Sequence, residues 1–378
     1  MKNLLFVLYG FFLLAFTFCT YFFIDPNISY LNWFYLHFQL GSHILKVALL
    51  FSILIIFFLF YLFILFLYMK KTLTMKDGMI LIAMTIIFLM VAYPAVYSYD
   101  IFNYIATAKV AFLYKENPYV IMPIEFTGEP LLRFMHAPNK VALYGPVWLL
   151  FTFIPYIFGN GNFIVTLFLF KGLVVIFYIL LLLFIYKLTH NFFSVLFVAL
   201  NPLVVIETIV SGHNDAVMMA LLLASLYYFL RARIFIGSSL FILSVFIKYA
   251  TLFLAPVFLV FSYLYKQKNI QRERFMNWLL FGMIGIFLLS SFREEIYPWY
   301  ALWFLPFVAI IGRRRDMLIA ILFTFCLELR YFPYMILLTH FGPTPYLKLL
   351  ITFLPLFMIF VFLYAKRICG KISFHFLR

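Results

Sequence analysis

The sequence predicts an all-α, polytopic membrane protein of about 10–12 transmembrane helices, with an outer loop of amphipathic and re-entrant helices. Of the 378 residues, 67% are hydrophobic and only 11% are charged, whereas soluble proteins are roughly half apolar and about a quarter charged. The apolar residues also form windows of about 20, the length that crosses a bilayer as a helix. A water-soluble domain is therefore excluded, and we expect residues 1–378 to form a single integral-membrane domain.

Apolar windows define the predicted spans in chain order. The clear ones are 4–24, 44–68, 78–96, 163–186, 192–209, 216–230, 275–291, 317–338 and 347–365. Shorter or ambiguous windows are 146–158, 235–248, 250–265 and 299–311. The first of these is too short to cross comfortably, so we expect it to be re-entrant. The N-terminal window is not followed by a small-residue cleavage pattern, so we expect a retained anchor.

The net charge of +15 is concentrated in loops that these spans place on one side of the membrane. The basic residues there are Lys2, Lys70, Lys71, Lys76, Lys187, Arg231, Arg233, Lys266, Lys268, Arg272, Arg274, Arg313, Arg314, Arg315, Lys366, Arg367, Lys371 and Arg378. The positive-inside rule assigns that side to the cytoplasm and makes 97–162 one extracytoplasmic loop. Because the basic residues are divided among short loops, they indicate membrane orientation, and we expect no nucleic-acid partner.

The loop 97–162 opens with a predicted amphipathic helix, capped by Ser98 and reaching about Lys115. Its polar face carries Asp100, Asn103, Tyr104, Thr107 and Ala111. We expect this helix to lie at the membrane interface. Asp100 would sit where water meets headgroups, a position that suits a base acting on a substrate with a lipid tail. The alternative, equally supported by spacing, is that Asp100 only stabilises the helix N-terminus.

The most polar run near the membrane follows the fifth span, after Asn201-Pro202, where proline weakens the helix. Its polar members are Glu207, His213, Asn214 and Asp215. A lone histidine is more often a structural residue, but this combination at a membrane boundary favours a functional site.

Lys248 is flanked by apolar residues for more than ten positions on either side. An unpaired ammonium group there is costly, so buried intramembrane charge is by default paired or functional. If 235–248 rises outward and 250–265 returns, Lys248 reaches the outer face. Its partner could be Asp215, Glu207 or an anionic substrate, and a purely structural ion pair is the alternative.

The remaining candidates lie in outer loops. Arg293 is a candidate phosphate contact, because its guanidinium group matches phosphate geometry. Tyr144, Tyr297 and Trp299 are candidates for substrate contact, although an ordinary interfacial aromatic belt explains them as well.

Taken together, these segments resemble the GT-C superfamily of integral-membrane glycosyltransferases, and within it the bacterial polyprenyl-phosphate-mannose-dependent mannosyltransferases. The likeness rests on SYDIFNY followed by NPY, then YGPVW, NPLVVIETIVSGHND, IKY and YPWY, in that order, over roughly residues 93–300. The resemblance implies a GT-C-like fold with Asp100 as the catalytic base. It also implies that His213, Asp215 and Lys248 line the donor pocket.

The same resemblance implies the substrates and the mechanism. The donor would be a hexose, mannose by analogy with the family, β-linked to a polyprenyl phosphate and delivered from the membrane lipid. The acceptor would be a hydroxyl group of an extracytoplasmic glycolipid or glycan, deprotonated by Asp100 as it attacks with inversion. Lys248, together with Arg293, would neutralise the departing phosphate. The sequence has no Gly-rich phosphate loop and no DxD pair, and we expect no nucleotide, metal or other cofactor.

Other classes of function stay open at this point. A secondary transporter or a flippase of lipid-linked intermediates would also bury charges in its spans. Such sites usually lie near the midplane between internal repeats, and no repeat is visible in the sequence. A ligase or acyltransferase of the cell envelope would also place a base at the outer face. The cluster of polar residues near one boundary argues against a non-catalytic scaffold.

Overall fold

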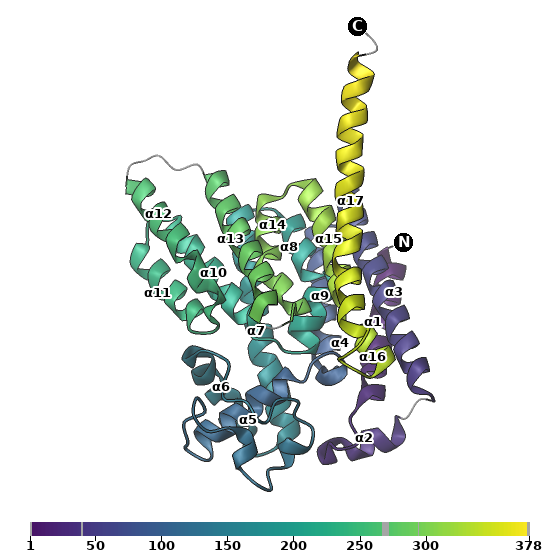
Figure 1. Ribbon diagram of the computed structural model, residues 1–378, viewed down its shortest axis with the longest axis vertical. Helices are drawn as coiled ribbons and strands as arrows, with labels where there is room; N and C mark the ends of the chain where they lie inside the picture. Colours follow the sequence, from purple (N-terminus) through teal and green to yellow (C-terminus); the bar gives the residue numbers. More distant parts are fainter. Residues whose placement is uncertain (1, 39–40, 267–271, 294, 376–378) are drawn as a thin grey trace.

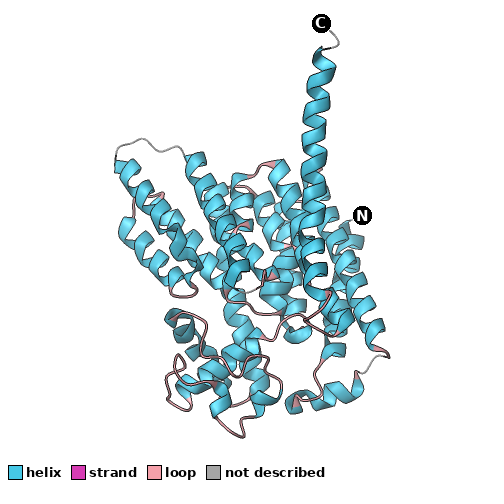
Figure 2. Ribbon diagram, in the orientation of Figure 1, coloured by secondary structure: helices cyan, strands magenta, loops and turns pink. Residues whose placement is uncertain are grey.

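The computed structural model describes residues 2–38, 41–266, 272–293 and 295–375, without the side chains of 264–266, 293 and 362–375. Within these ranges the chain consists of helices and loops and contains no strand (Figure 2). The predicted all-α class is thus confirmed.

Six of the described helical segments are long and apolar enough to cross a membrane. They contain α1 (Lys2–Thr20), α3 (His43–Met69), α7 (Phe163–Thr189), α13 (Arg272–Arg293), α15 (Arg314–Glu328) with α16 (Tyr331–Leu337), and α17 (Thr344–His375). The last of them runs well beyond the rest of the molecule (Figure 1). These helices confirm a polytopic membrane protein.

A seventh candidate span is bent by 63° between α8 (Phe192–Ala199) and the segment Pro202–Val210. This segment comprises α9 (Pro202–Val205) and the π-helical turn η6 (Ile206–Val210). The break falls where the sequence predicts it, because Pro202 has no N–H to continue the ladder of α8. The side chain of Asn201 accepts a hydrogen bond from the backbone N–H of Leu203 at 3.1 Å and so caps the new helix.

The other predicted spans are shorter than a bilayer requires. They are α4 (Met75–Met90), α6 (Pro146–Gly159), α10 (Asp215–Phe229), α11 (Ile234–Val245), α12 (Ala255–Lys266) and α14 (Leu305–Ile311). The longest, α4, has 16 residues and is about 24 Å long, against a hydrocarbon core of about 30 Å. The described residues therefore form six or seven candidate spans instead of the predicted 10–12, because these six helices are too short to count as spans. The expected shortness of α6 is confirmed at 14 residues, and its re-entrance stays a prediction.

The helices of the predicted outer loop and the short helix between α1 and α3 gather at one end of the molecule. Figure 1 shows α2 (Asn32–His37), α5 (Asp100–Phe112) and α6 at the end opposite the C-terminus. Short 3₁₀ turns connect the elements: η1 (Tyr21–Phe23), η2 (Ser29–Leu31), η3 (Pro94–Val96), η4 (Pro123–Glu125), η5 (Pro130–Arg133), η7 (Tyr249–Leu254) and η8 (Pro298–Trp303). Which end faces the cytoplasm stays a prediction from loop charge.

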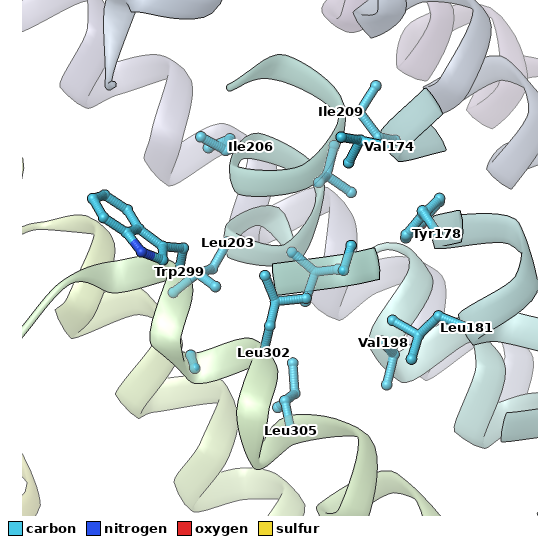
Figure 3. Packing of buried hydrophobic residues seen from close by; sticks show 14 of the residues in the cluster. Val174, Tyr178, Leu181, Val198, Leu203, Ile206, Ile209, Trp299, Leu302 and Leu305 are labelled. Atoms are coloured by element: carbon cyan, nitrogen blue, oxygen red, sulfur yellow. The ribbon is translucent and has the colours of Figure 1, made fainter. Parts of the chain in front are cut away.

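The core that carries the polar run is packed around α7. Figure 3 shows Val174 and Tyr178 of α7 near Ile209 of η6, and Leu203 of α9 near Trp299 of η8. These side chains are all buried. Tight packing fixes rotamers and backbone positions, so α9, η6 and η8 form a rigid base for the functional groups described next.

Candidate active site

A cavity of about 570 Å³ lies between the predicted outer loop and the part of the chain that follows α11. It is lined by six of the residues predicted from the sequence: Asp100, Asn103, Tyr144, Lys248, Tyr297 and Trp299. Tyr104, Glu207, His213, Asn214 and Asp215 are buried behind its wall instead. The remaining candidate, Arg293, ends α13, and its side chain lies outside the described residues.

Helix α5 presents Asp100 to the cavity from its first turn. The hydroxyl oxygen of Ser98 accepts a hydrogen bond from the backbone N–H of Asp100 at 3.3 Å. The N-cap residue is Tyr99, which makes no side-chain capping bond, so Ser98 lies one residue before the cap position predicted for it. The helix ends at Phe112 rather than about Lys115, which adopts a left-handed conformation with φ of 58°. Helix α5 is also buried on its apolar face and partly buried on its polar face, whereas an interfacial helix would expose its polar face. Tyr104, on the expected polar face, is 1% exposed and lies edge-on to Tyr144 and Trp148.

The YGPVW segment and the IKY segment meet at Gly145. Two backbone hydrogen bonds join the start of α6 to the end of α11, from Gly145 N–H to the carbonyl of Ile247 at 3.0 Å and from Val147 N–H to that of Phe246 at 3.1 Å. A Cβ at position 145 would lie 2.0 Å from the Phe246 carbonyl oxygen, so only glycine permits this approach. Since Tyr144 precedes this junction and Lys248 follows it, both side chains reach one cavity.

Lys248 forms an ion pair with Asp215, one of the partners predicted from the sequence. Its Nζ lies 3.0 Å from each carboxylate oxygen of Asp215. The indole N–H of Trp303 donates a further hydrogen bond to Asp215 Oδ1 at 2.5 Å. The ammonium group also lies over the ring of Tyr300, 4.7 Å from its centroid. Asp215 is fully buried, whereas the Lys248 side chain keeps 20% of its surface exposed toward the cavity.

His213 lies between two carboxylates. Its Nδ1 is 3.5 Å from Asp100 Oδ2, and its Nε2 is 3.1 Å from Glu207 Oε2. The carbonyl of Glu207 accepts the backbone N–H of His213 at 2.9 Å, which closes the chain into a tight loop. Gly212, with φ of 76°, permits this turn and lies against Ile101 of α5. Asn214 donates its backbone N–H to the Tyr104 hydroxyl at 3.4 Å.

The loop before α14 supplies the aromatic wall of the cavity. Trp299 stacks on His213 and on Tyr297, with ring centroids 4.0 and 4.4 Å apart. The loop is held from behind by Glu295, which pairs with Arg330 at 3.0 Å and with Lys348 at 2.8 Å. Trp299 and Tyr297 therefore form part of the cavity wall. An interfacial aromatic belt, the alternative offered by the sequence, would not require this position.

Several residues of the site were not predicted. His136 and Lys140 line the cavity from the outer loop, and Tyr300 and Trp303 line it from η8. Trp303 stands four residues after Trp299, and this helical spacing was the available signal. Burial lowers the pKa of His136, which stacks on Tyr99 at 3.8 Å. Nothing in the spacing of the residues around Lys140 distinguishes this stretch from an ordinary exposed loop.

An ion pair stabilises the outer loop beside the cavity. Lys109 of α5 lies 2.7 Å from Glu129 Oε1, and the Tyr114 hydroxyl donates to Glu129 Oε2 at 2.8 Å. Burial acts to raise the pKa of Glu129, but the hydrogen bonds from Lys109 and Tyr114 outweigh it and lower the pKa below its ordinary value. Glu129 therefore stays charged at neutral pH and fixes the loop that carries His136 and Lys140.

One further buried lysine lies beside Gly212. Lys171 of α7 is fully buried and donates from Nζ to the carbonyl oxygens of Ala92 at 2.6 Å and Leu89 at 3.3 Å. These carbonyls lie in the last turn of α4 and two residues beyond its end at Met90, where a helix leaves backbone acceptors without an intrahelical partner. In the described part of the chain, no group of three or more His, Cys, Asp or Glu side chains is arranged to hold a metal ion.

Comparison with known families identifies a match over most of the chain. The family model described as alpha-(1->6)-mannopyranosyltransferase, N-terminal domain, matches residues 9–264. These residues include Asp100, His213, Asp215 and Lys248. No curated protein and no solved structure was found to match.

Proposed function

The chain belongs to the MptA_B family of alpha-(1->6)-mannopyranosyltransferases, a GT-C type of membrane mannosyltransferase, and from this premise we propose its substrates and catalytic groups. The donor is a mannose β-linked to a polyprenyl phosphate, and the acceptor is a hydroxyl group of a glycolipid or glycan on the extracytoplasmic face of the cell membrane. Asp100 is the general base. The family favours this assignment over the transporter and flippase alternatives.

The observation that carries the proposal is the set of groups that line the cavity of about 570 Å³. A carboxylate, an ammonium group and an aromatic wall converge on it, from Asp100, Lys248 and η8 respectively. An apolar side, formed by Phe253, Ile286 and Leu289, completes it. This is the set of groups that a sugar joined to a phosphate and a hydrocarbon chain requires.

The apolar side suits the lipid part of the donor. Phe253 and Leu289 are 63% and 56% exposed on the surface of the helices η7 and α13, which places them where lipid chains would contact the protein. A prenyl chain lying between them would bring its phosphate to the ammonium end of the cavity. Burial of each CH₂ group of such a chain contributes about 0.8 kcal/mol.

The proposed reaction inverts configuration in one displacement. Asp100 removes the proton of the acceptor hydroxyl, whose oxygen attacks the anomeric carbon from the face opposite the phosphate. Lys248 faces the phosphate oxygen as the glycosidic bond breaks and negative charge develops there. Inversion of a β-linked donor gives an α-linked product, which agrees with the alpha linkage in the family description.

The proposed function is tested by incubating the purified protein with polyprenyl-phosphate mannose and a panel of lipid-linked acceptors. We expect transfer from this donor and none from GDP-mannose, and the product should be cleaved by an α-(1→6)-specific mannosidase. Matched reactions with the glucose and arabinose donors measure sugar selectivity. Failure with all three lipid-linked sugars would instead support a transporter or flippase.

Lys140 is expected to contact the donor phosphate. Lys248 is already neutralised by Asp215, whereas Lys140 has no ion-pair partner among the described residues and lines the same cavity. A hydrogen bond to a charged group contributes about 1.5–3 kcal/mol, so Lys140→Ala should raise the donor KM by roughly 10- to 100-fold. Lys140→Arg should retain most of the affinity.

The control for Lys140 is Arg133→Ala, which removes the same charge from an exposed position of the same loop without changing the cavity. Steady-state kinetics at two salt concentrations distinguish a contact from general attraction. An unchanged donor KM in Lys140→Ala, or an equal rise in Arg133→Ala, would contradict the assignment.

A further inference from the structure

His213 does not line the cavity, although it stands directly behind the proposed base. Its side chain is fully buried, whereas the side chain of Asp100 is 28% exposed. Only Asp100 therefore exchanges protons with the cavity. The contact between Asp100 Oδ2 and His213 Nδ1, at 3.5 Å, leads from this exposed carboxylate into the protein interior.

The groups around His213 are mostly acidic or aromatic. From α5 it faces Asp100, from η6 it faces Glu207, and from η8 it stacks on Trp299. Glu207 Oε1 also accepts the Tyr331 hydroxyl of α16 at 2.7 Å. Farther out lie Tyr97, whose ring is 5.2 Å from that of Tyr331, and the buried Glu328 of α15. The cation Lys171 of α7 borders Gly212 but donates to backbone carbonyls of 89 and 92.

The chemistry of imidazole determines how this arrangement is protonated. A neutral imidazole has one N–H and one acceptor nitrogen, so it can donate to only one of the two carboxylates. Glu207 is nearer, at 3.1 Å, and is fully buried, so an unpaired charge on it would be the more costly one. The N–H is therefore placed on Nε2, which leaves the lone pair of Nδ1 on the side of Asp100. Neither contact has hydrogen-bond geometry, and both ring nitrogens and Glu207 Oε2 are buried without a hydrogen-bond partner among the described residues.

We propose that His213 is the temporary acceptor of the proton that Asp100 removes from the acceptor hydroxyl. This inference rests on the proposed function. The hydroxyl proton moves to Asp100 as the C–O bond forms, and from Asp100 Oδ2 it passes to Nδ1. The imidazolium ion is stabilised by the two carboxylates and by the indole face of Trp299. When the products leave, the proton returns through Asp100 to water.

The arrangement has a direct consequence for catalysis. Passing the proton to His213 returns Asp100 to its charged form while the sugar is still bound, which prevents the hydroxyl from recapturing the proton. Once Asp100 carries the proton, its O–H can donate to the Nδ1 lone pair, and acid–base help of this kind contributes roughly 10²–10⁴-fold in rate. His213 thus acts on the rate of the chemical step rather than on donor binding.

The test is chemical rescue of His213→Ala in the full-length protein. We expect kcat to fall by roughly 10²-fold, the lower end of acid–base help. The donor KM should stay unchanged, because the variant keeps every residue that lines the cavity. Added imidazole should restore kcat in proportion to its neutral, basic form, so the rescue increases with pH through the imidazole pKa. Pyrrole has the same shape but no basic nitrogen and should restore nothing. His37→Ala, at an exposed position on α2, is the matched control.

Three results would overturn the inference: equal rescue by pyrrole and imidazole, a raised donor KM with unchanged kcat, or full activity of His213→Ala. If this variant does not fold, Glu207→Gln gives the second test, because glutamine retains an oxygen for the Tyr331 hydroxyl. It should lower kcat and alter the pH dependence of kcat at constant donor KM, and unchanged kinetics would contradict the proposal. Activity in Asp100→Asn would refute the proposed base itself, which distinguishes the two failures.

Discussion

Asp100→Asn is expected to reduce mannosyl transfer by at least roughly 10²–10⁴-fold, the contribution of general-base catalysis. Asparagine preserves the volume and the position at the start of α5 but cannot accept the hydroxyl proton. If Asp100 only stabilised the helix N-terminus, its loss would cost about 0.3–1 kcal/mol of stability and leave the rate unchanged. Initial rates at saturating donor, together with thermal unfolding in detergent, separate these two roles.

The control for Asp100 is Glu116→Gln, which removes an exposed carboxylate from the same outer loop. We expect this variant to transfer mannose at the wild-type rate. Wild-type kcat in Asp100→Asn would remove the proposed base. A rate loss accompanied by an equal loss of thermal stability would indicate a structural role.

Lys248→Ala is expected to have the largest effect on stability, about 3–5 kcal/mol. The substitution leaves the carboxylate of Asp215 fully buried, with only the Trp303 indole N–H and no counter-ion among its described contacts. The same variant should also weaken use of the donor, because Lys248 lines the cavity. Chemical or thermal unfolding measures the first effect, and the donor KM of the folded fraction measures the second.

The double variant Lys248→Leu/Asp215→Leu separates the two contributions of this pair. Replacing a buried ion pair by apolar side chains is often neutral for stability or favourable, so the double variant should unfold near the wild-type temperature. Donor use should nevertheless stay impaired if Lys248 faces the phosphate. A double variant as active as wild type would show that the ion pair is only structural.

The sequence was sufficient to predict the all-α membrane class and the place of nearly every helix. Hydrophobic windows predict where helices lie because lipid leaves the backbone no other way to satisfy its hydrogen bonds. The break at Asn201-Pro202 was predictable for a local reason, the missing N–H of proline. Helix lengths were less predictable. The window 78–96, for example, continues into η3, so that α4 itself ends at Met90.

The sequence predicted many of the residues that gather around the cavity, but it did not predict how deeply each of them is buried. Spacing along a helix indicated that Asp100 and Asn103 share a face, and both line the cavity. Spacing cannot indicate that His213 and Asp215 lie behind that cavity. Their depth depends on the left-handed turn at Gly212 and on the packing of η8, whose Trp303 lies 88 residues along the chain from Asp215. The sequence left three possible partners for Lys248, namely Asp215, Glu207 and an anionic substrate. The structure shows the pair with Asp215, and the position of Lys248 depends on the contact between α6 and α11 at Gly145, which spacing does not predict.

The cavity is built from two stretches of the chain, one that matches the family model and one that lies beyond the match. Asp100 and Lys248 fall within the matched residues 9–264, whereas the wall from Ile286 to Trp303 lies beyond them. A polypeptide cut after residue 264 would keep the proposed base and the ammonium group. It would lose the indole that holds Asp215 and the helix that forms the apolar side of the cavity. If the proposed function holds, the C-terminal third supplies the wall that selects the substrate, whereas the reacting groups come from the matched part of the chain.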